Sequence, residues 1–341
     1  MKYDVTIGVP FYNVQDYLRR ALDSALSQDY PSIEFLIVDD CSNDSSPSII
    51  HDILKHHPRR EHIRLITNPQ NMGVSGSRNI ILDEAHGEFL FFMDSDDVIA
   101  VNTISLMMQN IHKYEAEIVF GSYEKIEMSG EKYVYRYPSL QLLETDALAS
   151  FAYRKYAGIQ ASACNYLVKT SLLRENHLQF IDTDYWEDLV FTFDLVTYIS
   201  RAVLLPNITY TYLCRENSLS HYQQRNHIPK DEIMNNVAAI NYLKRSSSLF
   251  YNKVYFPNRC YNIFMTDFYI ACHILKRRND IVPSITNREI KALIQHPATW
   301  KQIGTFRHSR IKNMLLFLMG KLPSFLCVAV IWSLGKIKKL I

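Results

Sequence analysis

The chain has 341 residues, 48% hydrophobic and 21% charged, which indicates a globular protein with one large domain plus a second element, or with two domains. Its six cysteines form no C-x-x-C pair and no Cys/His cluster at zinc-ligand spacing, which argues against a disulfide framework and a zinc site. No long apolar segment precedes the first strand pattern, so we expect no signal peptide and a reducing, cytoplasmic compartment.

The net charge of +2 hides an asymmetry along the chain. After Glu289 there are nine basic residues and no acidic one, which leaves 28 of the 37 basic residues against all 35 acidic ones in residues 1–289. An acidic body gives no reason to expect a nucleic-acid partner. The basic end suggests that a charged surface is a partner.

The first hundred residues alternate between short apolar runs and longer amphipathic segments. They predict strands at 4–9, 33–40, 62–67 and 88–93, and helices at 14–28, 45–57 and 74–87, the last closed by Gly87. Continuous apolar strands separated by helices indicate an α/β fold with a parallel sheet covered on both faces. Residues 101–225 show a mixed pattern, and helical patterning dominates from about 229.

Polar side chains gather where the predicted strands end. They are Tyr12, Asn13, Asp39, Asp40, Asn68 and the "DSDD" run at 94–97. Ligands of parallel sheets bind at the carboxyl ends of the strands, so we expect a ligand at this edge. The chain has no G-x-G-x-x-G or Walker-type loop, which excludes an ordinary dinucleotide or P-loop site.

Several of these residues suit a phosphorylated ligand. Asp94 and Asp96 stand two apart at a strand end and can face one hard divalent cation, although a solvated acidic turn is the simpler alternative. Asp40 can accept hydrogen bonds from a base or sugar, and Tyr12 can stack on a base or merely pack. Arg78 lies early on a helix, where phosphate is attracted, or is a surface arginine.

Three segments carry a resemblance to a known family: "PFYNVQDYLRRALDSALSQDYPSIEFLIVDDCSNDSS" (10–46), "NPQNMGVSGSRN" (68–79) and "AHGEFLFFMDSDD" (85–97). Together they closely resemble the family 2 glycosyltransferases, inverting enzymes of the GT-A fold, strongly over residues 4–100 and weakly to about 220. The resemblance implies a GT-A domain at 1–225, with a Rossmann-like, mostly parallel sheet flanked by helices, followed by a helical region at 226–341.

The resemblance also implies the ligands of the sheet edge. The donor is a nucleotide-diphosphate sugar, which we expect to be UDP-linked, with Mn²⁺ or Mg²⁺ on its pyrophosphate. By position, Pro10, Tyr12 and Asp40 match the nucleoside-contacting residues. Arg78 matches the donor-contacting arginine, and Asp94 matches a ribose or sugar contact.

The same resemblance also implies which residues bind the metal and the donor phosphates. Asp96 matches the metal ligand. The segment "RENSLSH" (215–221) resembles the part of the family that covers the donor phosphates. There Arg215 and Ser220 would face the pyrophosphate, and His221 would complete the metal site.

The motif "WED" at 186–188 is similar to the family's Glu-Asp pair before a helix. An inverting transfer needs a carboxylate to take the proton of the acceptor hydroxyl, and we assign Asp188 as this base. Glu187 is its neighbour or an acceptor-binding group. The alternative is that both acids complement the dipole of the helix.

Three positions depart from the family pattern. Cys41 replaces the glycine of the common "DDGS", Ser77 replaces the alanine of "ARN", and Tyr166 follows Asn165 where a lysine is frequent. The last change puts acceptor or phosphate contacts on that side in doubt.

We therefore expect transfer of a hexose or related sugar from a UDP-type donor to a hydroxyl of a glycan, lipid-linked acceptors included, in bacterial surface-polysaccharide synthesis. A non-catalytic GT-A-like binding module would be expected to lose Asp96 or Asp188, and both are present. A nucleotidyltransferase would normally show a Gly-rich, basic phosphate loop near the first strand, which is missing. A scaffold would leave the acidic strand ends unexplained.

The last 28 residues, 314–341, are apolar and basic. The run Phe325–Leu334 is ten residues long, whereas a helix that spans a bilayer needs about 20. Two alternatives remain: a helix packed on the catalytic domain, or an amphipathic element on an anionic membrane surface. The basic surplus favours the second, which predicts a peripheral protein at the inner face of the cell membrane.

Overall fold

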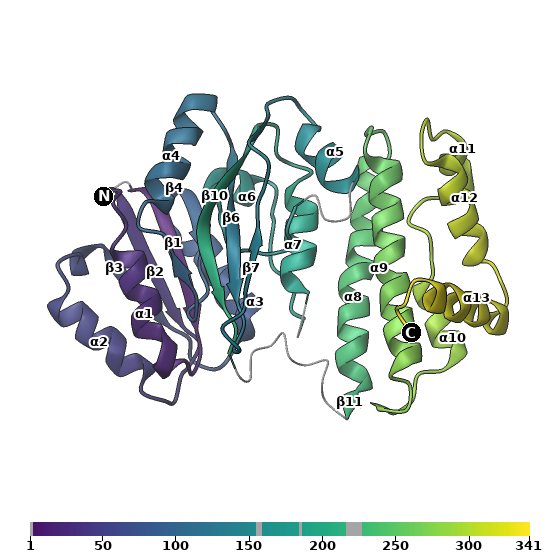
Figure 1. The fold of residues 1–341 in the computed structure, drawn as a ribbon, viewed down its shortest axis with the longest axis horizontal. Coiled ribbons are helices and arrows are strands. Elements are labelled where there is room, and N and C mark those ends of the chain that lie inside the picture. Colours follow the sequence, from purple (N-terminus) through teal and green to yellow (C-terminus); the bar gives the residue numbers. More distant parts are fainter. Residues whose placement is uncertain (1–2, 155–158, 184–185, 216–226) are drawn as a thin grey trace. The chain divides into compact units, whose positions relative to one another are not determined.

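The computed structural model describes residues 3–154, 159–183, 186–215 and 227–341. The chain divides into two compact units, one comprising residues 1–148, 161–182 and 187–221 and the other 149–160, 183–186 and 222–341. The described part of the first unit is an α/β structure built on a ten-stranded sheet, and the second is mainly helical (Figure 1).

The first four strands are parallel, as the sequence predicts. They are β1 (Tyr3–Phe11), β2 (Ile33–Asp39), β3 (Ile63–Thr67) and β4 (Gly87–Phe92), in the order β3-β2-β1-β4. Helices α1 (Gln15–Leu26), α2 (Ser46–His56) and α3 (Gly73–Glu84) connect them. Every residue of β2 is buried, because a central parallel strand has no solvent-facing side.

The register makes β1, β2 and β3 end level with one another, whereas β4 ends opposite Gly8, before the end of β1. Phe11 pairs with Asp39, Asp39 pairs with Thr67, and Gly8 pairs with Phe92. The residues that follow the strands therefore meet at one edge of the sheet, as expected from their positions in the sequence.

The predicted role of Gly87 is wrong. The helix ends at Glu84, and Gly87 is the first residue of β4. A Cβ atom on Gly87 would lie 2.3 Å from the backbone nitrogen of Thr6, so only glycine allows the two strands to approach.

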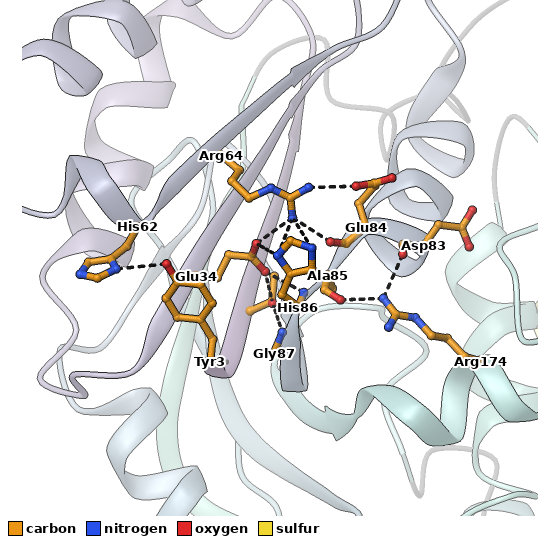
Figure 2. A network of polar contacts seen from close by, with 11 residues as sticks. Tyr3, Glu34, His62, Arg64, Asp83, Glu84, Ala85, His86, Gly87 and Arg174 are labelled. Carbon is orange, nitrogen blue, oxygen red and sulfur yellow. Dashed lines mark hydrogen bonds and ion pairs between the residues drawn. The ribbon is translucent and has the colours of Figure 1, made fainter. Parts of the chain in front are cut away.

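A buried carboxylate joins the strands near their amino ends (Figure 2). Glu34 of β2 accepts hydrogen bonds from Thr6 at 2.6 Å, from Arg64 at 2.8 Å and from the backbone nitrogen of His86 at 2.8 Å. Burial raises the pKa of Glu34, but these hydrogen bonds outweigh it and hold the pKa below its ordinary value. The network ties together β1, β2, β3 and the start of β4, and so holds the register.

The rest of the sheet is mixed. It continues from β4 through β9 (Tyr166–Lys169), β6 (Ile118–Ile126) and β10 (Ala202–Leu213) to β5 (Val98–Ile99), with β7 (Lys132–Tyr135) beside β6 and β8 (Leu140–Leu142) beside β10. β9 is antiparallel to both of its neighbours. The remaining helices of this part are α4 (Thr103–Tyr114), α6 (Thr170–Glu175) and α7 (Glu187–Leu195), while α5 (Ala147–Arg154) lies mostly in the second unit.

The second unit contains the predicted helical region. Its elements are β11 (Ile228–Pro229), α8 (Lys230–Ser246), α9 (Phe256–Lys276), β12 (Ile281–Val282), α10 (Asn287–Leu293), α11 (Trp300–Gly304), α12 (Arg310–Met319) and α13 (Ser324–Ile337). Arg259 of α9 is fully buried and donates to the Tyr153 hydroxyl at 2.7 Å. None of the helices within the described ranges combines the length and hydropathy that crossing a membrane requires.

Candidate functional site

The guanidinium of Arg78 joins three carboxylates that are far apart in the sequence. Its Nη2 donates to Asp94 Oδ1 at 2.9 Å, and its Nη1 donates to Glu187 Oε1 at 3.0 Å and to Asp188 Oδ1 at 2.5 Å. The Arg78 side chain is only 3% exposed. Burial lowers its pKa, but the charges of Asp188 and Asp94 outweigh burial and raise the pKa well above the ordinary arginine value. The structure therefore brings four of the predicted site residues together.

Helix α3 positions this arginine. The helix starts at Gly73, whose φ of 74° lies in the left-handed region, and the small Ser75 and Ser77 are buried beneath it. Asn79 donates to the carbonyl oxygen of Phe180 and accepts from its backbone nitrogen, both at 2.8 Å. These bonds hold the segment that leads toward α7 against α3.

Asp188 has the electrostatic character of a general base. Burial raises the pKa of its carboxyl to about 7, against the effect of Arg78 and with the help of the neighbouring charges of Glu187 and Asp94. Its side chain remains 25% exposed, so a substrate can reach it. A base with a pKa near the working pH is efficient at taking a proton. Both acids lie in the first turn of α7, where the helix dipole stabilises negative charge. The dipole alone does not explain why a buried arginine contacts them.

The carboxylates of the acidic run after β4 each have their own partners. Asp96 pairs through Oδ2 with Arg215 Nε at 2.5 Å, and Asp97 accepts from the Tyr210 hydroxyl at 2.8 Å and from the Leu213 backbone nitrogen at 2.9 Å. Burial and the neighbouring charges of Asp94 and Asp96 raise the pKa of Asp97 to about 8. Asp97 therefore anchors β10, whereas Asp94 and Asp96 stay partly exposed at 30% and 20%.

The donor set at Asp96 fits a hard divalent cation. Burial and the charge of Asp94 raise the pKa of Asp96, while its contact with Arg215 acts in the opposite direction. Among the described residues, no three His, Cys, Asp or Glu side chains are grouped around a common point. Mg²⁺ in nucleotide enzymes is commonly held by one or two carboxylates plus substrate phosphates, which matches Asp96 better than a complete protein cage would.

The residues predicted to contact the nucleoside lie at the ends of β1 and β2. Asp40 is buried, and its Oδ1 accepts from Asn68 Nδ2 at 2.7 Å and from the Met72 backbone nitrogen at 2.8 Å. Asn68 Nδ2 also donates to Ser77 Oγ at 3.1 Å, which connects this network to α3. Tyr12 is 43% exposed, which leaves its ring free to stack, and Pro10 is buried within β1.

Two departures from the family pattern have structural explanations. Cys41 has a φ of 65°, in the left-handed region where glycine is favoured, which explains why glycine is usual at this position. Tyr166 is buried in β9. The preceding Asn165 donates to the carbonyl oxygen of Gly121 at 2.5 Å and accepts from Thr209 at 2.5 Å. In this chain, Asn165 therefore joins β6 to β10.

Ser220 and His221 lie outside the described residues, so their predicted roles stay predictions. Sequence reasoning missed Tyr210, which accepts from the Asp94 backbone nitrogen at 3.1 Å in addition to its bond to Asp97. A tyrosine in a long strand carries no signal for such a contact.

Comparison with known proteins finds similarity to glycosyltransferases. Residues 6–171 match the family model for Glycosyl transferase family 2. The glycosyltransferase GlyA of Streptococcus pneumoniae is 31% identical over 230 residues, which cover 63% of this chain and 31% of GlyA. The Escherichia coli protein WfgD, a UDP-Glc:alpha-D-GlcNAc-diphosphoundecaprenol beta-1,3-glucosyltransferase, is 34% identical over 124 residues, 36% of this chain and 47% of WfgD. The matches thus span about a third to a half of these two relatives.

Solved structures show the same fold over most of the chain. TarS 1–349 of Staphylococcus aureus, in complex with UDP-GlcNAc, matches with a TM-score of 0.60 and 21% identity, covering 94% of this chain and 90% of that one. The mannosyltransferase PcManGT of Pyrobaculum calidifontis, in complex with GDP-Man and Mn²⁺, matches with a TM-score of 0.51 and 16% identity, covering 98% and 88%. The predicted family and fold are confirmed: residues 6–171 are a family 2 glycosyltransferase domain, and the chain has the GT-A fold.

Proposed function

We propose that this chain is an inverting, metal-dependent glycosyltransferase that moves a sugar from a UDP-type donor to a hydroxyl of a glycan acceptor during bacterial surface-polysaccharide synthesis. The observation that carries the proposal is the contact set of Arg78. It brings the candidate base Asp188 to Asp94, at the sheet edge where ligands of such folds bind.

The proposed reaction is a single displacement. The acceptor hydroxyl oxygen bonds to the anomeric carbon of the donor, on the side opposite the nucleotide. The bond from that carbon to the diphosphate oxygen breaks, and UDP leaves with the bonding electrons. Asp188 takes the hydroxyl proton, and Arg78 holds its carboxylate in place through the 2.5 Å contact. Glu187, on the same guanidinium, is its neighbour or contacts the acceptor.

Asp96 would hold Mn²⁺ or Mg²⁺, together with His221 if the family pattern extends to that position. When bound, the cation stabilises the negative charge on the leaving diphosphate. Arg215, which already lies at Asp96, and Ser220 would contact the same phosphates. The Mn²⁺ in the mannosyltransferase structure supports metal dependence of the reaction.

The names of the relatives support the substrates. TarS binds UDP-GlcNAc, and the name of WfgD contains UDP-Glc and a diphosphoundecaprenol acceptor. We therefore propose a UDP-sugar donor, a glycan acceptor that is lipid-linked, and a cytoplasmic reaction. The six cysteines, all of them among the described residues, are free thiols, in keeping with a reducing compartment.

A donor screen tests the proposal. The full chain is incubated with individual nucleotide sugars, with and without Mn²⁺, and release of the free nucleotide is measured. Release of UDP that requires Mn²⁺ supports the proposal. Binding without release would indicate a non-catalytic module. In a parallel incubation with nucleoside triphosphates and sugar 1-phosphates, release of pyrophosphate would indicate a nucleotidyltransferase.

Replacement of Asp96 by asparagine should abolish metal-dependent donor binding while the fold stays intact. Loss of a residue that merely orients a metal ligand already costs about 10–100-fold in affinity, so loss of the ligand itself should exceed this range. Calorimetric titration with UDP and Mn²⁺ measures the effect. The matched control is Asp52→Asn, which changes a half-exposed carboxylate on α2 and should bind like the wild type. Equal affinity in the Asp96 variant would remove Asp96 from the metal site.

A further inference from the structure

Helix α12 leaves a row of apolar side chains uncovered. Its buried residues are Asn313 and Met319. Ile311, Leu315 and Leu318 are 74%, 63% and 50% exposed. Their spacing of four and then three residues places them on one face of the helix. Within the described part of the chain, this face has no apolar cover.

Helix α13 has the same property. It is apolar nearly all round, a pattern that normally marks a fully buried helix. Its buried residues are Cys327, Ile331 and Gly335, which form one stripe along the helix. One such stripe is what a helix buries when it packs on one side only, and α13 packs on α9 and α10. Phe325 and Ile337 are 64% and 77% exposed.

An apolar groove connects the two helices. It has a volume of about 520 Å³ and is lined by residues of α9, α12 and α13, among them Phe268, Leu315 and Leu334. Lys312 and Lys338 also line it. Leu315 and Leu318 belong both to the exposed row of α12 and to the lining of the groove, so the row and the groove form one continuous surface, which we call the α12–α13 face.

The charges around this face are of one sign. From Arg310 to the end of the sequence there are six basic residues and no acidic one. Two lysine ammonium groups lie over aromatic rings: Lys336 Nζ is 3.7 Å from the centroid of Trp332, and Lys321 Nζ is 5.0 Å from that of Phe317. Long cationic side chains on apolar surface, with the charge at the rim, are the arrangement of a helix that lies in a membrane interface.

We propose that the α12–α13 face docks on an anionic lipid surface. The apolar rows would enter the acyl boundary while the lysines and Arg310 meet the headgroups. A second copy of the chain is a poorer occupant, because two faces that each carry these positive charges repel. A spanning helix is excluded for α13, whose 14 residues fall short of the roughly 20 that a bilayer requires.

Flotation of the full chain with vesicles tests the proposal. Vesicles of phosphatidylglycerol and phosphatidylcholine are compared with vesicles of phosphatidylcholine alone, at low salt and at about 1 M salt, where the screening length falls to about 3 Å. We expect the protein to float with the anionic vesicles at low salt and to float much less in the other conditions. Protein that stays at the bottom with anionic vesicles at low salt, or binds both vesicle types equally, overturns the proposal.

Two variants separate the apolar and the charged contributions. The triple change Ile311→Ser, Leu315→Ser, Leu318→Ser should lower partitioning by roughly tenfold per residue. The change Lys336→Gln, Lys338→Gln, Lys339→Gln should lower it by roughly fivefold per residue at low salt, with little effect at high salt.

The matched control is Leu249→Ser with Val254→Ser, two side chains that are 72% and 71% exposed outside the face. This variant should float like the wild type. Wild-type flotation of the triple serine variant contradicts the assignment of the face. The assignment is also contradicted if the wild type never floats and is a dimer that becomes a monomer in the triple variant. That result would make a second copy of the chain the occupant of the face. The measurement uses neither donor nor acceptor, so its outcome does not depend on the proposed reaction.

Discussion

Replacement of Asp188 by asparagine should lower sugar transfer by about 10²–10⁴-fold, because a general base typically contributes that much. Asparagine keeps the shape of the side chain and can still accept from Arg78, so UDP binding in the presence of Mn²⁺ should be unchanged. Steady-state transfer at saturating donor, with calorimetric titration of UDP alongside, measures the two effects. The control is Glu187→Gln, which alters the other carboxylate on Arg78 Nη1 and should lose less transfer. If the Asp188 variant keeps near wild-type transfer, the base lies elsewhere, and Glu187 is the first candidate.

The pH dependence gives a second readout of the same residue. The pKa of Asp188 is raised to about 7, chiefly by burial, so its carboxyl is protonated below that pH and cannot accept a proton. The wild-type kcat/KM, which reports the free enzyme, should therefore fall as the pH drops through about 7 and level off above it. A profile without this acidic limb would argue against Asp188 as the base.

Replacement of Arg78 by methionine should destabilise the first unit by about 3–5 kcal/mol near pH 8, the cost of removing one partner from a buried ion pair. Three carboxylates, those of Asp94, Glu187 and Asp188, lose their cation. Burial already raises the pKa of Asp188 to about 7, and without the opposing effect of Arg78 this carboxyl binds a proton more readily in the folded than in the unfolded chain. The stability of the variant should accordingly increase as the pH falls from 8 toward 6. Urea unfolding followed by circular dichroism at both pH values measures the change.

The control for Arg78 is an arginine whose ion pair is exposed. Arg19 pairs with Asp52 at 2.5 Å, and both side chains are about half exposed. Arg19→Met should cost about 0.2–1 kcal/mol, as surface pairs do. Equal stability of the Arg78 and Arg19 variants would show that the guanidinium of Arg78 does not hold the cluster together.

The parallel half of the sheet follows from local pattern alone. Apolar runs of strand length, separated by amphipathic helices, leave few other arrangements, and the register then follows from burial. For this reason the sequence correctly predicts that Tyr12, Asp40 and Asp94 lie at one edge of the sheet. The boundary at Gly87 is predicted wrongly, because its glycine is required by contact with Thr6, a residue 81 positions away.

The long-range contacts of the candidate site cannot be predicted from local sequence pattern. Arg78 and Asp188 are 110 positions apart, and Arg215 and Asp96 are 119 apart. No periodicity links such pairs, since the first turn of α7 meets Arg78, and Arg215 meets Asp96, only in the assembled fold. From residue type alone, Arg78 could be a surface arginine and residues 94–97 a solvated acidic turn. In the folded protein Arg78 is buried and Asp97 accepts a hydrogen bond from Tyr210, so neither alternative holds.

The carboxyl-terminal end shows the same division. Composition by itself determined that residues 314–341 are apolar, basic and too short in their apolar runs to span a bilayer, because these properties are sums over the chain. Whether those side chains are buried depends on what packs against them. Tertiary structure decided this: α13 buries one stripe on α9 and α10, and the opposite side chains stay exposed. Sequence determines which groups are available, and packing determines which of them remain free for a ligand or a surface.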